Sequence, residues 1–193
     1  MIRQAKESDI TRISELYCLY IEDSFFVHFG KGFLKELFKN IIISKHALCF
    51  VYEIDGKVQG FITGAFQLSK LFREMFFRKC HVWAIKVMPQ IIRYPSSIKY
   101  IIESFLYSVK AHIENINSEL LFIAIEPEFR KKGVASLLVD RIIKDFRNKG
   151  VSKVKVATVK NNKGVNKFLE SYGAYFEREF KFYGKNMILY IIK

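Results

Sequence analysis

The sequence contains few of the features that build disulfide-rich, metal-binding or membrane-spanning proteins. Its three cysteines, Cys18, Cys49 and Cys80, are far apart and form no Cys-x-x-Cys pair, and its four histidines show no metal-ligand spacing. We therefore expect reduced thiols, no disulfide framework, no metal and a cytoplasmic location. The apolar runs are much shorter than the roughly 20 residues of a membrane span. The charged start MIRQAKESDI predicts no signal peptide.

Acidic residues are also scarce relative to basic ones, and the imbalance is concentrated in one segment. The formal net charge is +13. Between Arg130 and Lys167 there are twelve lysines and arginines but only two acids, Asp140 and Asp145. Such a field favours an anionic partner, which could be a nucleic acid, an anionic membrane or a polyphosphate ligand. A solvated basic surface without a dedicated partner is the alternative.

Hydrophobic periodicity predicts a mixed α/β fold in a single domain spanning residues 1–193. We expect strands at 1–5, 47–54, 57–66, 119–125, 153–159, 174–183 and 187–192, and helices at 7–21, 32–44, 134–150 and 161–173. Ser8 or Asp9 should cap the first helix, and its apolar face should comprise positions 10, 13, 16 and 19. Asp55-Gly56 predicts one tight hairpin, and residues 184–186 are expected to turn the last one.

Residues 67–116 interrupt the alternation of strands and helices and are expected to form a helical insertion between the third and fourth strands. Pro89 and Pro95 would divide it into two helices. The segment has eight lysines and arginines against three acids. It could pack as extra core, cover an acceptor pocket, lie on an anionic membrane surface or form a dimer interface.

The segment EPEFRKKGVASLL, residues 126–138, places a basic turn between an apolar strand and a helix. A glycine-bearing turn that opens a helix binds phosphate well, because free backbone N–H groups converge there and the helix dipole favours negative charge. Gly133 would supply backbone freedom and Ser136 a hydroxyl. Neither G-x-x-x-x-G-K-[ST] nor G-x-G-x-x-G is present, so the turn alone is a phosphate-site hypothesis.

The order strand, Arg130-Lys-Lys-Gly133-Val-Ala135, helix, strand, then Asn162 opening a helix that ends at Gly173, resembles the GNAT superfamily of acyl-CoA-dependent N-acyltransferases. The resemblance covers the whole chain except the insertion. It implies a central mixed, largely antiparallel sheet flanked by helices. RKKGVA matches the family motif [QR]-x-x-G-x-[GA], which holds the CoA pyrophosphate on backbone N–H groups, and the cationic segment suits the three phosphate groups of CoA.

Residue roles follow from the same resemblance. Ile125 would donate its N–H to the thioester oxyanion. The residues expected to bind the acyl donor are Ile123, Ala124, Ile125, Arg130, Lys131, Lys132, Gly133, Val134, Ala135, Ser136, Asn162 and Phe168. The family's leaving-group tyrosine position is occupied here by Leu169, which cannot donate a proton, so Tyr172 is an alternative acid. The base, acting directly or through a water, is left open between Glu126 and His28, with Glu128 and His81 weaker candidates.

The sequence therefore predicts an acetyl-CoA-dependent N-acetyltransferase that acts on a primary amine of a small molecule. The basic insertion suggests an amino sugar or a nucleotide-linked amino sugar as acceptor. A protein or peptide amine is the second acceptor class. A CoA-binding or membrane-surface module without turnover is the alternative that Leu169 raises. Nucleic-acid binding is disfavoured because no recognisable motif or aromatic stacking platform is present. A homodimer is left open.

Overall fold

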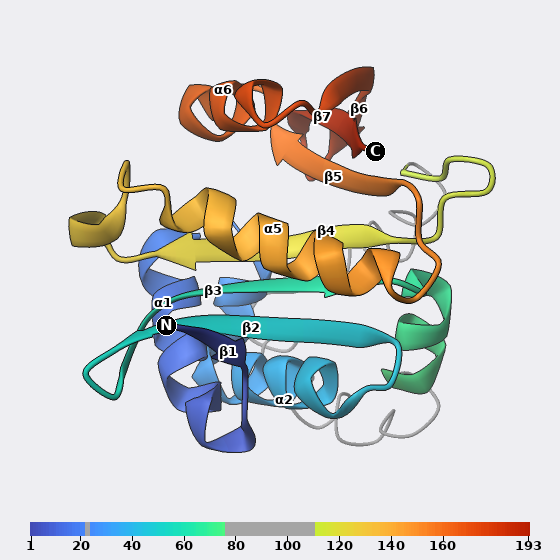
Figure 1. The fold of residues 1–193 in the computed structure, drawn as a ribbon. Coiled ribbons are helices and arrows are strands. Elements are labelled where there is room, and N and C mark those ends of the chain that lie inside the picture. The colour runs from blue at the N-terminus through green and yellow to red at the C-terminus, as the bar shows by residue number, and fades with distance from the viewer. Residues whose placement is uncertain (22–23, 76–110) are drawn as a thin grey trace.

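The computed structural model describes residues 1–21, 24–75 and 111–193, apart from the side chains of Phe25 and His28. The described chain folds into one domain around a seven-stranded sheet, with strand order β1-β2-β3-β4-β5-β7-β6 (Figure 1). The strands are β1 Ile2–Gln4, β2 Ala47–Ile54, β3 Lys57–Ala65, β4 Glu119–Ile125, β5 Val154–Val159, β6 Tyr175–Phe182 and β7 Lys185–Ile192. Every neighbouring pair is antiparallel except β4 and β5. The expected mixed, largely antiparallel sheet is confirmed.

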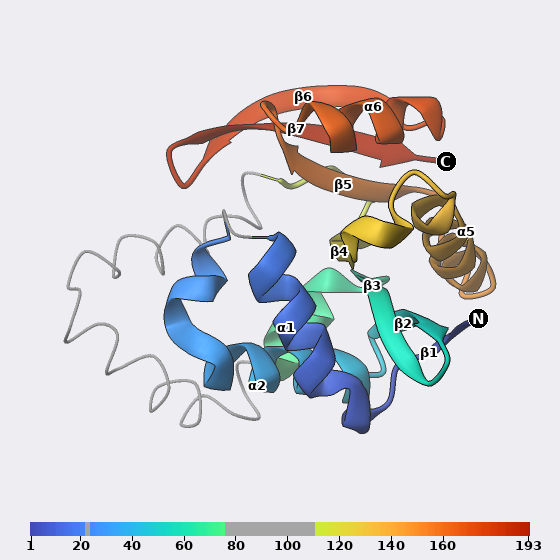
Figure 2. The same cartoon turned by 90° about the vertical axis from the view of Figure 1, so that its left-hand side faces the viewer.

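The helices cover both faces of this sheet. Helices α1 (Ile10–Tyr20) and α2 (Gly30–Ile43) lie on one side of β2 and β3, and α5 (Val134–Arg147) lies on the other (Figure 2). Helix α6 (Lys163–Ser171) shares a buried cluster with α5, in which Leu169, Leu138 and Tyr190 take part. Three 3-10 turns join these elements: η1 (Glu7–Asp9), η2 (Phe25–Phe29) and η3 (Pro127–Phe129).

Helix α1 departs from its expected face and cap. Ile10, Ile13 and Leu16 are buried, but Leu19 is 52% exposed and Tyr17 is buried in its place. With 3.6 residues per turn, the buried stripe advances from 13 to 16 and 17 and does not reach 19. The expected side-chain cap is also absent, because the Asp9 carboxylate accepts bonds from the Arg3 guanidinium at 2.7 and 3.0 Å instead of capping α1.

Both hairpins form, and the second turns one residue earlier than expected. Asp55 and Gly56 have φ values of 49° and 73°, as a two-residue turn with two positive φ angles requires. The β6–β7 turn uses Tyr183 and Gly184, with φ values of 49° and 70°. Lys185, which the sequence placed in the turn, already begins β7.

Most of the expected insertion lies outside the described residues, including Pro89, Pro95 and His81. Residues 68–75 are helical, as expected. Residues 111–116 are not, because they form a turn with an isolated bridge between Ile113 and Ile116. In the described ranges no helix is both long enough and apolar enough to cross a membrane.

The pairing of β4 with β5 is short, and this positions the site. The two strands pair only at Glu119–Lys155 and Leu120–Val156. The next residue, Leu121, is an extra residue of β4 that has no partner in the register with β3. Beyond it, β5, β7 and β6 continue as a separate part of the sheet above β1–β4 (Figure 2). Among the described strands, the remaining length of β4 therefore has a neighbour on one side only.

A buried ion pair fixes the point where the strands still meet. The Lys155 ammonium lies 3.4 Å from a Glu119 carboxylate oxygen, and the two side chains are 4% and 3% exposed. Lys155 also donates to the carbonyl of Ala111 at 2.9 Å. Removing one partner of such a pair costs about 3–5 kcal/mol, because the other charge stays buried. The pair thus ties β4 and β5 to the end of the insertion.

Candidate functional site

Helix α5 begins with an open N-terminus. Gly133 precedes it with φ +79°, and no side chain caps the helix. The first donor in the helix is Leu137, whose N–H bonds the Gly133 carbonyl at 3.0 Å. The N–H groups of Gly133, Val134, Ala135 and Ser136 thus have no acceptor within the helix, as at any helix start. The structure therefore has the backbone arrangement that the phosphate-site hypothesis requires.

The end of β4 directs some of its backbone groups to the edge opposite β3, where β5 no longer pairs with it. Glu126 donates its N–H to the Gln59 carbonyl of β3 at 2.8 Å. Successive residues of an antiparallel strand direct their backbone groups to opposite edges. Ile125 and Ile123 therefore direct their N–H groups away from β3, while Ala124 directs its own toward β3. Two of the three β4 residues predicted to bind the acyl donor, Ile123 and Ile125, therefore direct their N–H groups to the edge that does not pair with β3.

The cationic segment divides into residues at the turn and residues used elsewhere. Lys131 and Lys132 are exposed beside Gly133. Several others have protein partners: Lys155 pairs with buried Glu119, Lys160 with Glu179 at 2.6 Å, and Arg141 with Asp145 at 3.5 Å. Arg147 donates to the carbonyl of Lys193 at 2.8 Å. The cluster in sequence is thus not a single anion-binding surface.

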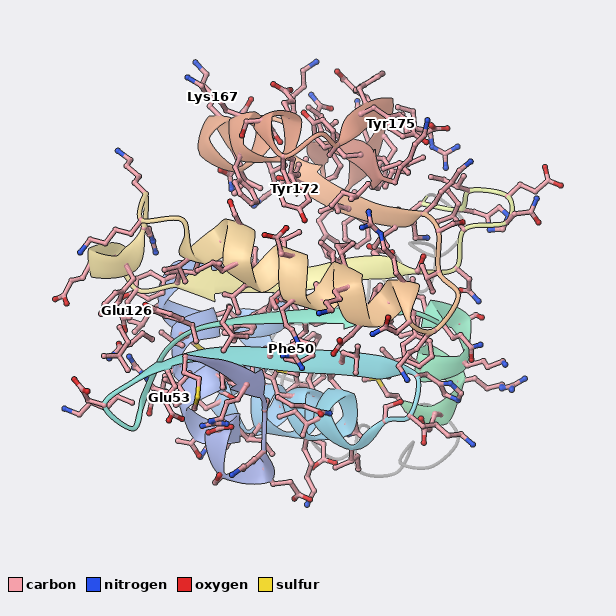
Figure 3. The ribbon with its side chains drawn as sticks, in the orientation of Figure 1. Phe50, Glu53, Glu126, Lys167, Tyr172 and Tyr175 are labelled. Atoms are coloured by element: carbon pink, nitrogen blue, oxygen red, sulfur yellow. The ribbon has the colours of Figure 1, made fainter. Side chains whose placement is uncertain are left out.

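A polar network occupies the end of β4, where Glu126 was a candidate base. Its Oε1 accepts from the Arg12 guanidinium at 2.5 Å, and its Oε2 accepts from the Tyr20 hydroxyl. The hydrogen bond to Glu126 raises the pKa of Tyr20. Figure 3 shows Glu126 beside the turn that leads to α5. Both carboxylate oxygens therefore have donors, and one donor is a cation.

Tyr172, the candidate acid, lies between α6 and α5 (Figure 3). Its hydroxyl donates to Asp140 Oδ1 at 2.6 Å. Burial, and then this hydrogen bond, raise the pKa of Tyr172. Leu169, at the family's tyrosine position, is only 3% exposed and packs in the core. The tyrosine is thus bonded to a neighbouring helix, and the leucine cannot take part in proton transfer.

The remaining predicted residues lie at or in α6, in η3 and in η2. Asn162 caps α6, its side chain accepting the N–H of Val165 at 3.2 Å. The Phe168 ring lies 5.9 Å from the ring of Tyr172. Glu128 is exposed in η3. The side chain of His28, the other candidate base, lies outside the described residues.

Sequence reasoning missed two members of the network around Glu126. Tyr20 and Arg12 belong to α1 and reach Glu126 across 106 and 114 positions of the chain. No local pattern marks such contacts. In the described part of the chain, no three His, Cys, Asp or Glu side chains gather as a metal site would require.

Comparisons with known proteins show a family similarity over part of the chain and a shared fold. Residues 99–174 match the "Acetyltransferase (GNAT) family". An N-acetyltransferase from Staphylococcus aureus Mu50 is 21% identical, with a TM-score of 0.63 over 100% of this chain and 97% of that one. The ribosomal-protein-S18-alanine N-acetyltransferase from Escherichia coli is 12% identical, with a TM-score of 0.62 over 100% and 92% of the two chains.

A third structure, from Salmonella typhimurium, was determined with its cofactor acetyl-CoA and is described as an acetyltransferase. It is 13% identical, with a TM-score of 0.63 over 100% of this chain and 92% of that one. No curated protein matches the sequence. At these identities the structures establish the fold, and the family match covers the strand, turn and helix from which the site is built. Residues 99–174 are therefore similar to the GNAT acetyltransferase family, and the chain shares the fold of these acetyltransferase structures.

Proposed function

We propose that the protein transfers an acetyl group from acetyl-CoA to a primary amine by direct attack in a ternary complex. The observation that carries this proposal is the open start of α5 beside a strand edge that directs the Ile125 N–H away from β3. Acetyl-CoA supplies an activated thioester and a polyphosphate that such a turn can hold. Gly133 to Ser136 would bind the pyrophosphate, and Ile125 and Ile123 would bind the thioester end.

The acceptor that we favour is a small-molecule amine such as an amino sugar. The attacking nitrogen forms a bond to the carbonyl carbon, the carbon–sulfur bond breaks and the amine loses a proton. The base, acting directly or through a water, stays open between Glu126 and His28. A base other than Glu126 would leave the network with Arg12 and Tyr20 intact. The thiolate can leave without a protein acid, because its pKa of about 8.5 makes it a tolerable leaving group.

A protein or peptide amine is the second candidate acceptor. It is favoured by the structural likeness to the ribosomal-protein-S18-alanine N-acetyltransferase. A donor-binding module without turnover is the third possibility, and buried Leu169 at the tyrosine position favours it. Cytoplasmic location, homodimerisation, membrane contact through the insertion and the absence of nucleic-acid binding stay predictions.

Two measurements test the proposal. Thermal unfolding with acetyl-CoA should show a stabilisation of about 2.7 kcal/mol at 100 times the dissociation constant. Pyrophosphate at the same concentration should give a smaller shift. Equal shifts with both ligands, or none with acetyl-CoA, would contradict the donor assignment.

Thiol release from acetyl-CoA then distinguishes the acceptors. The panel should contain amino sugars, nucleotide-linked amino sugars and peptides with a free N-terminal alanine. Release with an amino sugar supports the favoured acceptor, and release only with peptides supports the second candidate. Binding without release on any amine supports the module.

A further inference from the structure

The side chain of Arg130 makes its hydrogen bond to the end of β4 and lies over a ring of α1. Its Nε donates to the carbonyl of Ile125 at 2.8 Å, and its guanidinium carbon lies 4.6 Å from the centroid of the Tyr20 ring. Between Ile125 and Arg130 the backbone turns through η3. The side chain therefore closes this loop by returning to the last residue of β4. An arginine used for phosphate binding would instead direct its paired N–H groups to the ligand.

The Tyr20 ring, on which Arg130 lies, is itself held by a hydrogen bond. The Tyr20 hydroxyl donates to Glu126, and Glu126 also pairs with Arg12 at 2.5 Å. Arg12 in turn donates from Nε to the Val58 carbonyl of β3 at 3.1 Å. An arginine that stacks on an aromatic ring while donating to an oxygen is restricted in both tilt and rotation. The network thus holds Arg130 against β4 from α1 and β3.

We propose that Arg130 is a positioning residue, which holds the Ile125 carbonyl and so sets the end of β4 relative to the turn at Gly133. This inference rests on the proposed function, because a bound acyl donor would contact both of these places. The pyrophosphate would then be bound by backbone N–H groups and by Lys131 and Lys132. Arg130 would act through Ile125.

Two substitutions separate positioning from phosphate binding. In glutamine the side-chain nitrogen is attached to Cδ, as Nε is in arginine, so Arg130→Gln keeps a planar N–H at the same point and removes the charge. Arg130→Lys keeps the charge, but its amine is one bond further along the chain and has no plane to stack on Tyr20. If Arg130 is a positioning residue, Arg130→Gln should keep the hydrogen bond to Ile125 and the acetyl-CoA affinity, and Arg130→Lys should lose both. Phosphate binding predicts the reverse.

The first readout uses the free protein. The carbonyl ¹³C chemical shift of Ile125, measured by NMR without any ligand, reports the hydrogen bond from residue 130. We expect Arg130→Gln to leave it close to the wild-type value and Arg130→Lys to move it. If both variants move it, or neither does, the positioning role is overturned. Thermal unfolding of each variant shows that the fold is retained.

The second readout is acetyl-CoA affinity by calorimetry at two salt concentrations. We expect Arg130→Gln to bind within about threefold of wild type with the same salt dependence. Arg130→Lys should bind about tenfold more weakly, as expected when one well-placed hydrogen bond and its stacking are lost. Tight binding by the lysine variant, with weak and less salt-dependent binding by the glutamine variant, would make Arg130 a phosphate ligand and overturn the inference. If wild type does not bind acetyl-CoA, the proposed function fails, while the carbonyl shift still decides the role of Arg130.

Discussion

The helices that follow β4 and β5 begin in different ways. Helix α5 starts at Gly133, with no side chain on its first N–H groups. Helix α6 starts at Asn162, whose own side chain accepts one of them. Both were expected to contact the acyl donor. A capped helix start has already used part of its capacity to bind an anion, whereas an uncapped one has not. The comparison favours α5 over α6 as the proposed pyrophosphate site.

The largest effect on acetyl-CoA affinity is expected from a substitution at the open start of α5. Gly133→Val places a β-branched residue at φ +79°, which costs about 1–2 kcal/mol, and its Cβ would meet no neighbouring atom within 4 Å, so the cost comes from the backbone angle and not from a clash. We expect the turn to relax and acetyl-CoA affinity to fall about 10- to 30-fold. Titration calorimetry measures this affinity.

Gly150→Val is the matched control for this change. Gly150 has φ +80°, an added Cβ there would likewise meet no atom within 4 Å, and the residue lies beyond the other end of α5. It should lose comparable stability in thermal unfolding while binding acetyl-CoA like wild type. Equal loss of affinity in both variants would show that the turn at Gly133 has no special role.

The second prediction tests which lysines contribute to acetyl-CoA binding at the turn before α5. Replacing Lys131 and Lys132 together by glutamine should weaken acetyl-CoA binding about fivefold to tenfold at low salt and flatten its salt dependence. The matched pair is Lys144→Gln with Lys153→Gln, which removes the same charge. Lys144 lies eleven residues beyond Gly133, or about 16 Å along the helix. If the distant pair weakens binding as much, the effect is one of net charge rather than of contact.

The third effect tests the capped start of α6. Asn162→Ala removes the acceptor for Val165 N–H and should lower the free energy of unfolding by about 1 kcal/mol. Asn162→Asp, which keeps an acceptor, should restore most of it. Chemical denaturation measures both variants. We expect acetyl-CoA affinity to fall less than threefold in the alanine variant, and a tenfold loss would show that Asn162 contacts the donor.

The smallest effect concerns the contact between the two helices. Tyr172→Phe removes the hydrogen bond to Asp140 and should cost less than about 1 kcal/mol, since the group is partly exposed. The pKa of Tyr172 is raised in the folded protein, so its contribution is fully present at neutral pH. That contribution should decline as the pH rises above about 10, the value in the unfolded chain.

Unfolding free energies of wild type and Tyr172→Phe across pH 6 to about 11 test this dependence. Asp140→Asn should lose a similar amount, and the double variant little more. Thiol release by Tyr172→Phe should stay within about threefold of wild type. A loss of hundredfold or more would instead identify Tyr172 as the acid.

Features that depend on neighbouring residues could be predicted from the sequence. The positive φ angles at Asp55, Gly56 and Gly133 follow from turn chemistry. Helical periodicity predicts a shared face of α5 with Ala135, Leu138, Val139, Ile142 and Phe146; all but Ala135, which is only partly buried, are buried. These signals lie within a few residues of the feature that they predict. For this reason the sheet, the order of the helices and the candidate phosphate turn could be predicted from the sequence.

Features that depend on distant residues could not be predicted. Asp9 was expected to cap α1, but Arg3 and Glu53 draw it into a network with β1 and β2. Glu126 was considered as a solvated turn residue or a base, but Tyr20 and Arg12 take both its oxygens. In each case the partner comes from another element, and the competing interaction appears only when the chain is folded.

The extra residue of β4, Leu121, has a consequence for the way this strand tolerates change. Each residue of a strand faces opposite to its neighbours, so one unmatched residue reverses the parity of everything beyond it. Leu121 therefore determines that Ile123 and Ile125, rather than Phe122 and Ala124, turn their N–H groups to the open edge. Deleting Leu121, which packs against the core, would exchange both the edges and the faces of the strand beyond it. In this protein one residue of spacing separates a strand that only completes a sheet from one that can also hold a ligand.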